Sequence, residues 1–143
     1  MNENRKAEPL WRQQALDVGH RDKGFTGLCG LEFTEIKDDG VIISCTLRDD
    51  LRNPAGSAHG GLIATMADVA ASTMAFQADR VRHPIVTQSC SIHYLRKGQN
   101  GRLEAHARLV RKGRRVCVSA VEIMDEEGTL LATATYEIAY LDP

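Results

Sequence analysis

A single carboxylate lies inside an uncharged stretch of sequence that opens with His-Gly-Gly. Asp68 is the one acidic or basic residue between His59 and Asp79, and small or apolar residues surround it. If a helix begins at Gly60, its first N–H groups have no partner within the helix, and together with the helix dipole they can stabilise an oxyanion. A carboxylate that activates water and an oxyanion donor are the two components that hydrolysis of an acyl group requires.

Asp68 also has a purely structural interpretation. A lone charge on a helix commonly points to water, or it hydrogen-bonds a nearby hydroxyl, here that of Thr65 or Ser72. The preceding segment, NPAGSAHGG at 53–61, favours the chemical interpretation, because its proline and three glycines form a loop that can bring backbone close to a ligand.

The helix predicted from Gly60 to Phe76 divides into two arcs at 100° per residue. One arc is bulky and is expected to pack on a sheet: Leu62, Ile63, Met66, Val69, Ala70, Thr73, Met74 and Phe76. The other arc carries Asp68 among small residues: Gly61, Ala64, Thr65, Ala67, Ala71, Ser72 and Ala75. We therefore expect the small arc to face another backbone or a ligand rather than the protein's own sheet.

The spacing of Gly60 and Asp68 limits what one chain can do. Eight residues of helix separate them by roughly 12 Å, so one carbonyl group cannot contact both. Two such helices running antiparallel across a two-fold axis would place the start of one beside the middle of the other. We therefore expect a site shared between subunits, with a homodimer as the minimal active unit.

Strands account for most of the remaining sequence. They are predicted at 31–36 and 41–47 around the turn KDDG, and then at 85–95, 102–110, 116–124 and 129–140. Their connections are too short for parallel crossovers, which predicts an antiparallel sheet and an α+β fold. A helix between Pro9 and Gly19 is expected in an N-terminal segment, 1–30, that packs on a single domain formed by 31–143.

Composition excludes several classes of protein. The 143 residues carry a net charge of −1, which gives no reason to expect nucleic acid or an anionic membrane as a partner. No apolar run is long enough to cross a bilayer. The four cysteines form no C-x-x-C pair, which favours reduced thiols in a cytoplasmic protein. No histidine or cysteine spacing indicates a metal site.

The motif Asn53, His59-Gly60-Gly61 and Asp68 resembles that of the hotdog-fold acyl-CoA thioesterases of the phenylacetate-pathway and thioesterase superfamily member type. The segments 87–96 and 113–135 are also similar, and the resemblance covers about 31–140. It implies a curved antiparallel sheet wrapped around one long central helix. It also implies hydrolysis of an acyl- or aryl-CoA thioester to free acid and coenzyme A, which is thus part of the substrate and not a cofactor. Dimers of this family often associate into tetramers.

The resemblance also implies roles for individual residues. Asp68 is expected to act as general base or nucleophile, and the Gly60 N–H as donor to the thioester carbonyl. Asn53 and His59 are expected to order the loop, the thioester or water. Thr87 stands where relatives place a hydroxyl that faces the site, although serine is commoner there.

Further residues are expected to bind the substrate. They are Gly61, Thr65, Arg96, Lys97, Gly113 and Arg114. The cations among them are suited to the phosphates of coenzyme A, Arg114 foremost, whereas the alternative is a solvated hairpin tip.

Two other functions stay open. One is a non-catalytic acyl-CoA-binding protein that retains Asp68. The other is a different hotdog enzyme, such as a thioester dehydratase, which would pair a histidine with an acid near the helix. The spacing in this sequence does not supply that pair.

Overall fold

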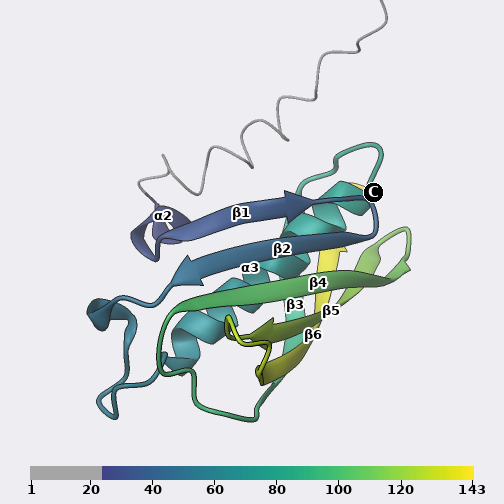
Figure 1. The fold of residues 1–143 in the computed structure, drawn as a ribbon. Helices are drawn as coiled ribbons and strands as arrows, with labels where there is room; N and C mark the ends of the chain where they lie inside the picture. Colours follow the sequence, from purple (N-terminus) through teal and green to yellow (C-terminus); the bar gives the residue numbers. More distant parts are fainter. Residues whose placement is uncertain (1–23) are drawn as a thin grey trace, which may run out of the picture.

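The computed structural model describes residues 24–143 and contains one long helix against one sheet (Figure 1). The elements are α2 (Phe25–Leu28), β1 (Leu31–Ile36), β2 (Gly40–Thr46), the 3-10 helix η1 (Asp49–Leu51), α3 (Gly60–Ala78), β3 (Ile85–Tyr94), β4 (Arg102–Lys112), β5 (Val116–Met124) and β6 (Leu130–Tyr140). The six strands lie in the order β1-β2-β4-β5-β6-β3, and every neighbouring pair is antiparallel. The predicted α+β hotdog fold is confirmed, whereas the helix expected between Pro9 and Gly19 lies outside the described residues.

Tight turns produce the antiparallel pairing. The Lys37 N–H donates to the Gly40 carbonyl at 2.8 Å between β1 and β2, and the Gly113 N–H donates to the Val116 carbonyl at 2.9 Å between β4 and β5. A Cβ atom on Gly113 would lie 2.7 Å from the Val116 carbonyl oxygen, so this turn has no room for a side chain.

One face of the sheet forms the core. Leu103, Ala105 and Ala107 of β4 are buried, and they alternate with partly or fully exposed residues. The neighbouring strands β5 and β6 alternate in the same way. The sequence predicted this alternation for β6, whereas the apolar residues of β5 were expected on both faces of the sheet. The buried face of the sheet packs on α3, mainly through β4, β5 and β2.

The predicted division of α3 into a sheet-facing arc and a free arc is wrong in part. Three alanines of the small arc, Ala67, Ala71 and Ala75, are fully buried in the core of this chain. Val69 and Phe76 of the bulky arc are only partly buried. The sheet curves around the helix, so it covers more of the helix than a flat sheet would. The partly exposed stripe runs through Ala64, Thr65, Asp68, Val69, Ser72, Thr73 and Phe76.

Strand β3 forms one edge of the sheet and bonds only to β6. None of its ten residues is buried, although alternate side chains point to the same side as the core residues of β6. A long edge strand with free N–H and C=O groups is a template for pairing with another chain.

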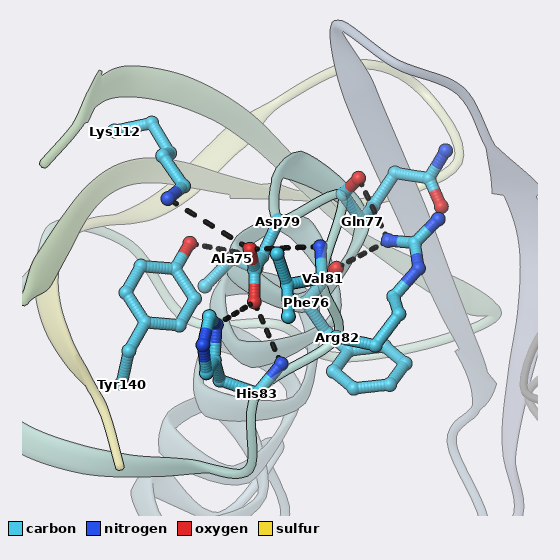
Figure 2. A network of polar contacts seen from close by, with 9 residues as sticks. All are labelled: Ala75, Phe76, Gln77, Asp79, Val81, Arg82, His83, Lys112 and Tyr140. Carbon is cyan, nitrogen blue, oxygen red and sulfur yellow. Dashed lines mark hydrogen bonds and ion pairs between the residues drawn. The ribbon is translucent and has the colours of Figure 1, made fainter. Parts of the chain in front are cut away.

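The C-terminal end of α3 is held by side chains from two other segments, β6 and the loop that follows the helix (Figure 2). The Tyr140 hydroxyl donates to the Ala75 carbonyl at 2.7 Å, and the Arg82 guanidinium donates to the carbonyls of Phe76 and Gln77. These are carbonyls of the last helical turn, to which no further turn of the helix donates, and the Phe76 carbonyl also accepts from the Asp79 N–H at 3.3 Å. The three side-chain bonds therefore supply donors to the carbonyls of Ala75, Phe76 and Gln77.

Asp79 follows the helix, and its carboxylate is buried, with 2% of the residue exposed. It accepts hydrogen bonds from the Val81 N–H at 3.2 Å and the His83 N–H at 2.7 Å, and it contacts His83 Nδ1 at 2.8 Å. Lys112 Nζ lies 3.8 Å away. Burial raises the pKa of Asp79, but the hydrogen bonds from His83 and Val81 outweigh it and hold the pKa below its usual value.

We predict that Asp79→Asn lowers the free energy of unfolding at pH 7 by about 1–3 kcal/mol, because a buried network loses its charged acceptor. A carboxyl group with a lowered pKa in the folded state stabilises the protein above the unfolded pKa, near 3.9, and this contribution is lost as the pH falls through the folded value. The difference between parent and variant should therefore shrink below about pH 4. Denaturant titrations between pH 3 and 7 measure this.

Asp39→Asn is the matched control, because Asp39 is exposed in the β1–β2 turn. It should change the stability little at any of these pH values. An Asp79→Asn difference that stays constant from pH 7 to pH 3 would contradict the role assigned to the carboxylate.

Candidate active site

The loop before α3 is ordered by Asn53. Its Oδ1 atom accepts hydrogen bonds from the Ala55 N–H at 3.0 Å and the Ser57 N–H at 3.1 Å. The Asn53 N–H in turn donates to the Ser57 carbonyl at 2.8 Å, and Gly56 between them has a φ of 84°, which favours glycine. In this chain the Asn53 side chain acts on the loop itself.

Further bonds fix this loop against the rest of the fold. The Ala58 N–H donates to the Gly98 carbonyl at 2.7 Å, and the His59 N–H donates to the Leu51 carbonyl at 3.0 Å. The Arg52 guanidinium reaches the carbonyls of both Gly56 and Gln99. The helix start is therefore held between η1 and the segment that joins β3 to β4.

His59 caps the helix in a way that selects one free N–H group. Its Nδ1 atom accepts a hydrogen bond from the Gly61 N–H at 2.9 Å, which requires the proton of a neutral ring to be on Nε2. The N–H groups of Leu62 and Ile63 donate to the His59 carbonyl. Within residues 24–143 the Gly60 N–H has no acceptor. The first helical N–H is thus available to a ligand, at the positive end of the helix dipole.

Asp68 lies on the partly exposed stripe of α3, and its partner comes from the edge strand. The Thr87 hydroxyl donates to Asp68 Oδ1 at 2.6 Å. The neighbouring hydroxyl of Thr65 donates instead to the Gly61 carbonyl at 2.7 Å, so it does not bond to Asp68. The bond to Oδ1 orients the Asp68 carboxylate, and its Oδ2 atom has no hydrogen-bond partner among the described residues.

Two hollows flank the start of α3. One, of about 340 Å³, is lined by Asn53, Gly60, Arg96 and Lys97 together with Tyr94. The other, of about 580 Å³, brings His59, Gly61 and Thr65 together with apolar side chains: Phe25, Leu28, Cys29, Leu51 and Leu62. Seven of the predicted site residues thus line one of these two hollows within one chain, whereas Asp68 and Thr87 meet farther along the helix.

Gly113 and Arg114 lie at the other end of the molecule. They form the β4–β5 turn, whose neighbour Lys112 contacts Asp79 just beyond the C-terminus of α3. The structure therefore does not bring them together with Gly60 within one chain. Arg96 is exposed, and its guanidinium donates to the Leu130 carbonyl at 2.9 Å.

Sequence reasoning missed the tyrosines beside the helix. The Tyr94 hydroxyl donates to the Gly60 carbonyl at 3.1 Å, and the Tyr136 hydroxyl donates to the Ala64 carbonyl at 3.1 Å. A signal was present for Tyr136, because it falls on the inward face of an alternating strand and a buried hydroxyl needs a partner. Nothing in the sequence indicates which carbonyl that partner is.

Within residues 24–143 no group of three or more histidine, cysteine or acidic side chains is arranged to hold a metal ion. No helix in this part of the chain is long and apolar enough to cross a membrane.

Known proteins are similar to this chain in sequence. Over 90 residues the chain is 32% identical to the medium/long-chain acyl-CoA thioesterase YigI of Escherichia coli K12, a match that covers 54% of this chain and 58% of that protein. This chain thus spans a little over half the length of that relative. It is 24% identical over 115 residues to the 1,4-dihydroxy-2-naphthoyl-CoA hydrolase of the same organism, covering 80% and 85% of the two chains.

A solved structure agrees in fold and sequence. The phenylacetic acid degradation protein PaaI of Thermus thermophilus superposes with a TM-score of 0.74 at 30% identity, covering 82% of this chain and 98% of that one. Residues 55–132, which include α3, Thr87 and the loop from Ala55 onward, match the thioesterase superfamily. This chain is therefore a member of the thioesterase superfamily.

Proposed function

We propose that this protein is an acyl-CoA thioesterase, which hydrolyses an acyl-CoA thioester to a free acid and coenzyme A. The observation that carries the proposal is the Gly60 N–H, which has no acceptor within residues 24–143 because His59 caps the next residue instead. This N–H polarises the thioester carbonyl and holds the oxyanion that forms there.

Asp68 supplies the second half of the chemistry. As a general base it takes a proton from water, the water oxygen bonds to the carbonyl carbon, and the carbon–sulfur bond breaks to give acid and thiol. As a nucleophile its oxygen bonds to the carbonyl carbon, the thiolate leaves, and water then cleaves the anhydride. The hydrogen bond from Thr87 supports either route, since it fixes the direction of the carboxylate.

The two groups act together across a dimer. Within one chain eight residues of helix, roughly 12 Å, separate Gly60 from Asp68. Antiparallel pairing of two β3 edges would place Asp68 of the partner subunit near Gly60, since Tyr94 at one end of β3 contacts Gly60 and Thr87 near the other contacts Asp68. The exposed edge of β3 supports this arrangement. Assembly of two dimers into a tetramer stays a prediction, as does the cytoplasmic location.

The hollow beside Gly61 suits an apolar acyl group. Its volume of about 580 Å³ falls within the usual range of small-molecule sites, and apolar side chains line much of it. Phe25 and Leu28 at this hollow are 65% and 70% exposed, which is high for residues of this type. The medium- and long-chain substrates named for the YigI relative support the same assignment.

Cations suited to the coenzyme A phosphates come from two places. Arg96 and Lys97 line the hollow that contains Gly60. Gly113 and Arg114 lie at the opposite end of α3, so in an antiparallel dimer the partner subunit would bring this turn toward the Gly60 site. Arg114 therefore remains a predicted phosphate contact.

The alternatives have less support. A dehydratase would need a histidine paired with an acid at the helix start, but His59 Nδ1 is engaged by the Gly61 N–H. The histidine–acid pairs in the described part of the chain are His83–Asp79 and His106–Glu104, neither of which is at that place. A non-catalytic binder would show no release of thiol.

Replacing Gly60 by proline removes the proposed oxyanion donor. Gly60 is the first helical residue, a position that tolerates proline, and the extended backbone of His59 before it is compatible with proline. We predict that Gly60→Pro lowers kcat by about 10²-fold or more, as the loss of an oxyanion donor does in other hydrolases. Circular dichroism checks that the helix remains.

Gly60→Ala is the control, because it adds a carbon and keeps the N–H. The added Cβ would lie 3.5 Å from Tyr94, an ordinary contact distance. This variant should lose much less activity than Gly60→Pro. Equal losses in the two variants would exclude the N–H as the reason.

Asp68→Asn keeps the size of the side chain and removes its basic and nucleophilic charge. We predict that the parent protein releases thiol from acyl-CoA substrates and that Asp68→Asn lowers kcat by about 10²-fold or more. Fold and substrate affinity should persist. A variant that hydrolyses its best substrate at the parental rate would return Asp68 to a structural role.

Mixed dimers of Asp68→Asn and Gly60→Pro subunits extend this experiment to the shared site. If each site uses Gly60 of one subunit and Asp68 of the other, a mixed dimer has one doubly altered site and one intact site. After random exchange about a quarter of all sites should be active. If each site lies within one chain, mixing restores nothing.

Leu28→Trp should change which acyl chain is accepted. The larger side chain would fill part of the apolar hollow, so we predict that kcat/KM falls about tenfold or more for acyl chains of ten or more carbons and stays close to the parental value for acetyl- and butyryl-CoA. Val110→Trp is the control, since Val110 is also exposed but lies near the far end of β4. Equal effects on all chain lengths would place the acyl group elsewhere.

A further inference from the structure

All three tyrosines of the chain bond to the same helix. Their hydroxyl groups donate to backbone carbonyls of α3: Tyr94 to Gly60 at 3.1 Å, Tyr136 to Ala64 at 3.1 Å, and Tyr140 to Ala75 at 2.7 Å. The tyrosines come from β3 and β6, two neighbouring strands of the sheet.

The hydrogen bond from Tyr136 to the Ala64 carbonyl lies one helical turn before Asp68. In an α-helix the N–H of each residue donates to the carbonyl four residues earlier, so the Ala64 carbonyl accepts from the Asp68 N–H as well as from Tyr136. Tyr136 is 2% exposed, whereas Asp68 is partly open to solvent. A buried side chain of the sheet thus holds the backbone of the turn that carries the carboxylate.

The environment keeps Tyr136 a hydrogen-bond donor. Burial raises the pKa of Tyr136 well above its usual value, and the nearby Cys90 and Asp68 act in the same direction. The hydroxyl therefore stays protonated over the pH range in which an enzyme of this kind is assayed.

The strand pairing links this contact with the one made by Thr87. Tyr136 of β6 pairs with Cys90 of β3, and Thr87 of β3 pairs with Ile138 of β6. The β3 strand consequently holds the Asp68 side chain, and the β6 strand holds the Ala64 carbonyl of the same helical turn. The register between the two strands fixes the separation of these two contacts.

We propose that Tyr136 is a positioning residue for Asp68, in that its hydroxyl holds the Ala64 carbonyl and thereby sets the distance of the Asp68 carboxylate from the reacting carbon. This role rests on the proposed thioesterase function of Asp68. Small displacements of a reacting group are costly, with a shift of about 1 Å reducing rates up to about 10²-fold.

Tyr136→Phe tests the proposal, because it removes the hydroxyl and keeps the ring in the core. The Ala64 carbonyl retains its helical partner, so the protein should remain folded. We expect kcat for acyl-CoA hydrolysis to fall about tenfold with KM changed less than about twofold, since the contact affects the reacting group and not the binding of coenzyme A.

Tyr140→Phe is the matched control. It removes the same kind of bond to the same helix, at the Ala75 carbonyl near the C-terminus (Figure 2). We expect a similar loss of melting temperature in the two variants and a parental kcat in Tyr140→Phe. Parental kcat in Tyr136→Phe would overturn the proposal, as would parallel losses of kcat in both variants, which would indicate a general effect of stability.

A measurement without turnover separates this proposal from the proposed function. In protein labelled with ¹³C at aspartate side chains, Tyr136→Phe should change the carboxyl chemical shift of Asp68 and speed exchange of its amide hydrogen, whereas Tyr140→Phe should change neither. If the parent protein releases no thiol from any acyl-CoA, the thioesterase function fails, and these two signals still decide whether Tyr136 holds Asp68. An Asp68 spectrum identical in the parent and Tyr136→Phe overturns the positioning role.

Discussion

The packing of one curved sheet around α3 is the constraint on which the other features depend. The sheet is wide enough to bury Ala67, Ala70, Ala71 and Ala75 of the helix, but it ends at β3 and leaves one stripe of α3 partly open. Asp68 lies on that stripe and takes its hydrogen bond from the edge strand itself. The boundary between the covered and the uncovered parts of the helix is therefore where a carboxylate can be both fixed and accessible to a substrate.

The two ends of α3 differ in how their backbone groups are satisfied. At the C-terminus Arg82 and Tyr140 donate to carbonyls of the last turns, and the buried Asp79 orders the chain that follows. At the N-terminus His59 satisfies the N–H of Gly61 and leaves that of Gly60 without an acceptor in the described chain. The added hydrogen bonds at the C-terminus stabilise the helix, whereas the free Gly60 N–H at the N-terminus presents the positive end of the helix dipole to a ligand.

Hydroxyl groups of β3 and β6 hydrogen-bond to α3, so the register of these strands fixes where the helix lies along the sheet. Helix side chains pack through non-directional contacts, which tolerate small shifts along the helix axis. The hydrogen bond from Tyr136 to the Ala64 carbonyl does not tolerate such shifts, because a hydrogen bond weakens steeply as its distance and angle depart from the optimum. Polar contacts in the core of this fold therefore contribute precision at the candidate site in addition to stability.

The fold followed closely from local patterns in the sequence. Alternation along β4 and β6, short turns such as that at Gly113, and the single long apolar helix were enough to predict the six strands, the helix and the antiparallel pairing. These features depend on residues near one another in the chain, where periodicity is directly visible. The two faces of α3 were predicted less well, because a helical projection cannot show how far a sheet curves around it.

For the candidate site, the sequence alone determined which chemical groups are present. The residue types and spacing of His59, Gly60 and Asp68 identified a helix start and a carboxylate, because these groups belong to one continuous helix. Only the tertiary structure decided their partners. That Thr87 orients Asp68, that Tyr136 holds its turn, and that the β4–β5 turn lies at the far end of the helix all depend on how strands distant in sequence pair beside α3. Strand register brings together residues that no local pattern connects, so this information exists only once the chain has folded.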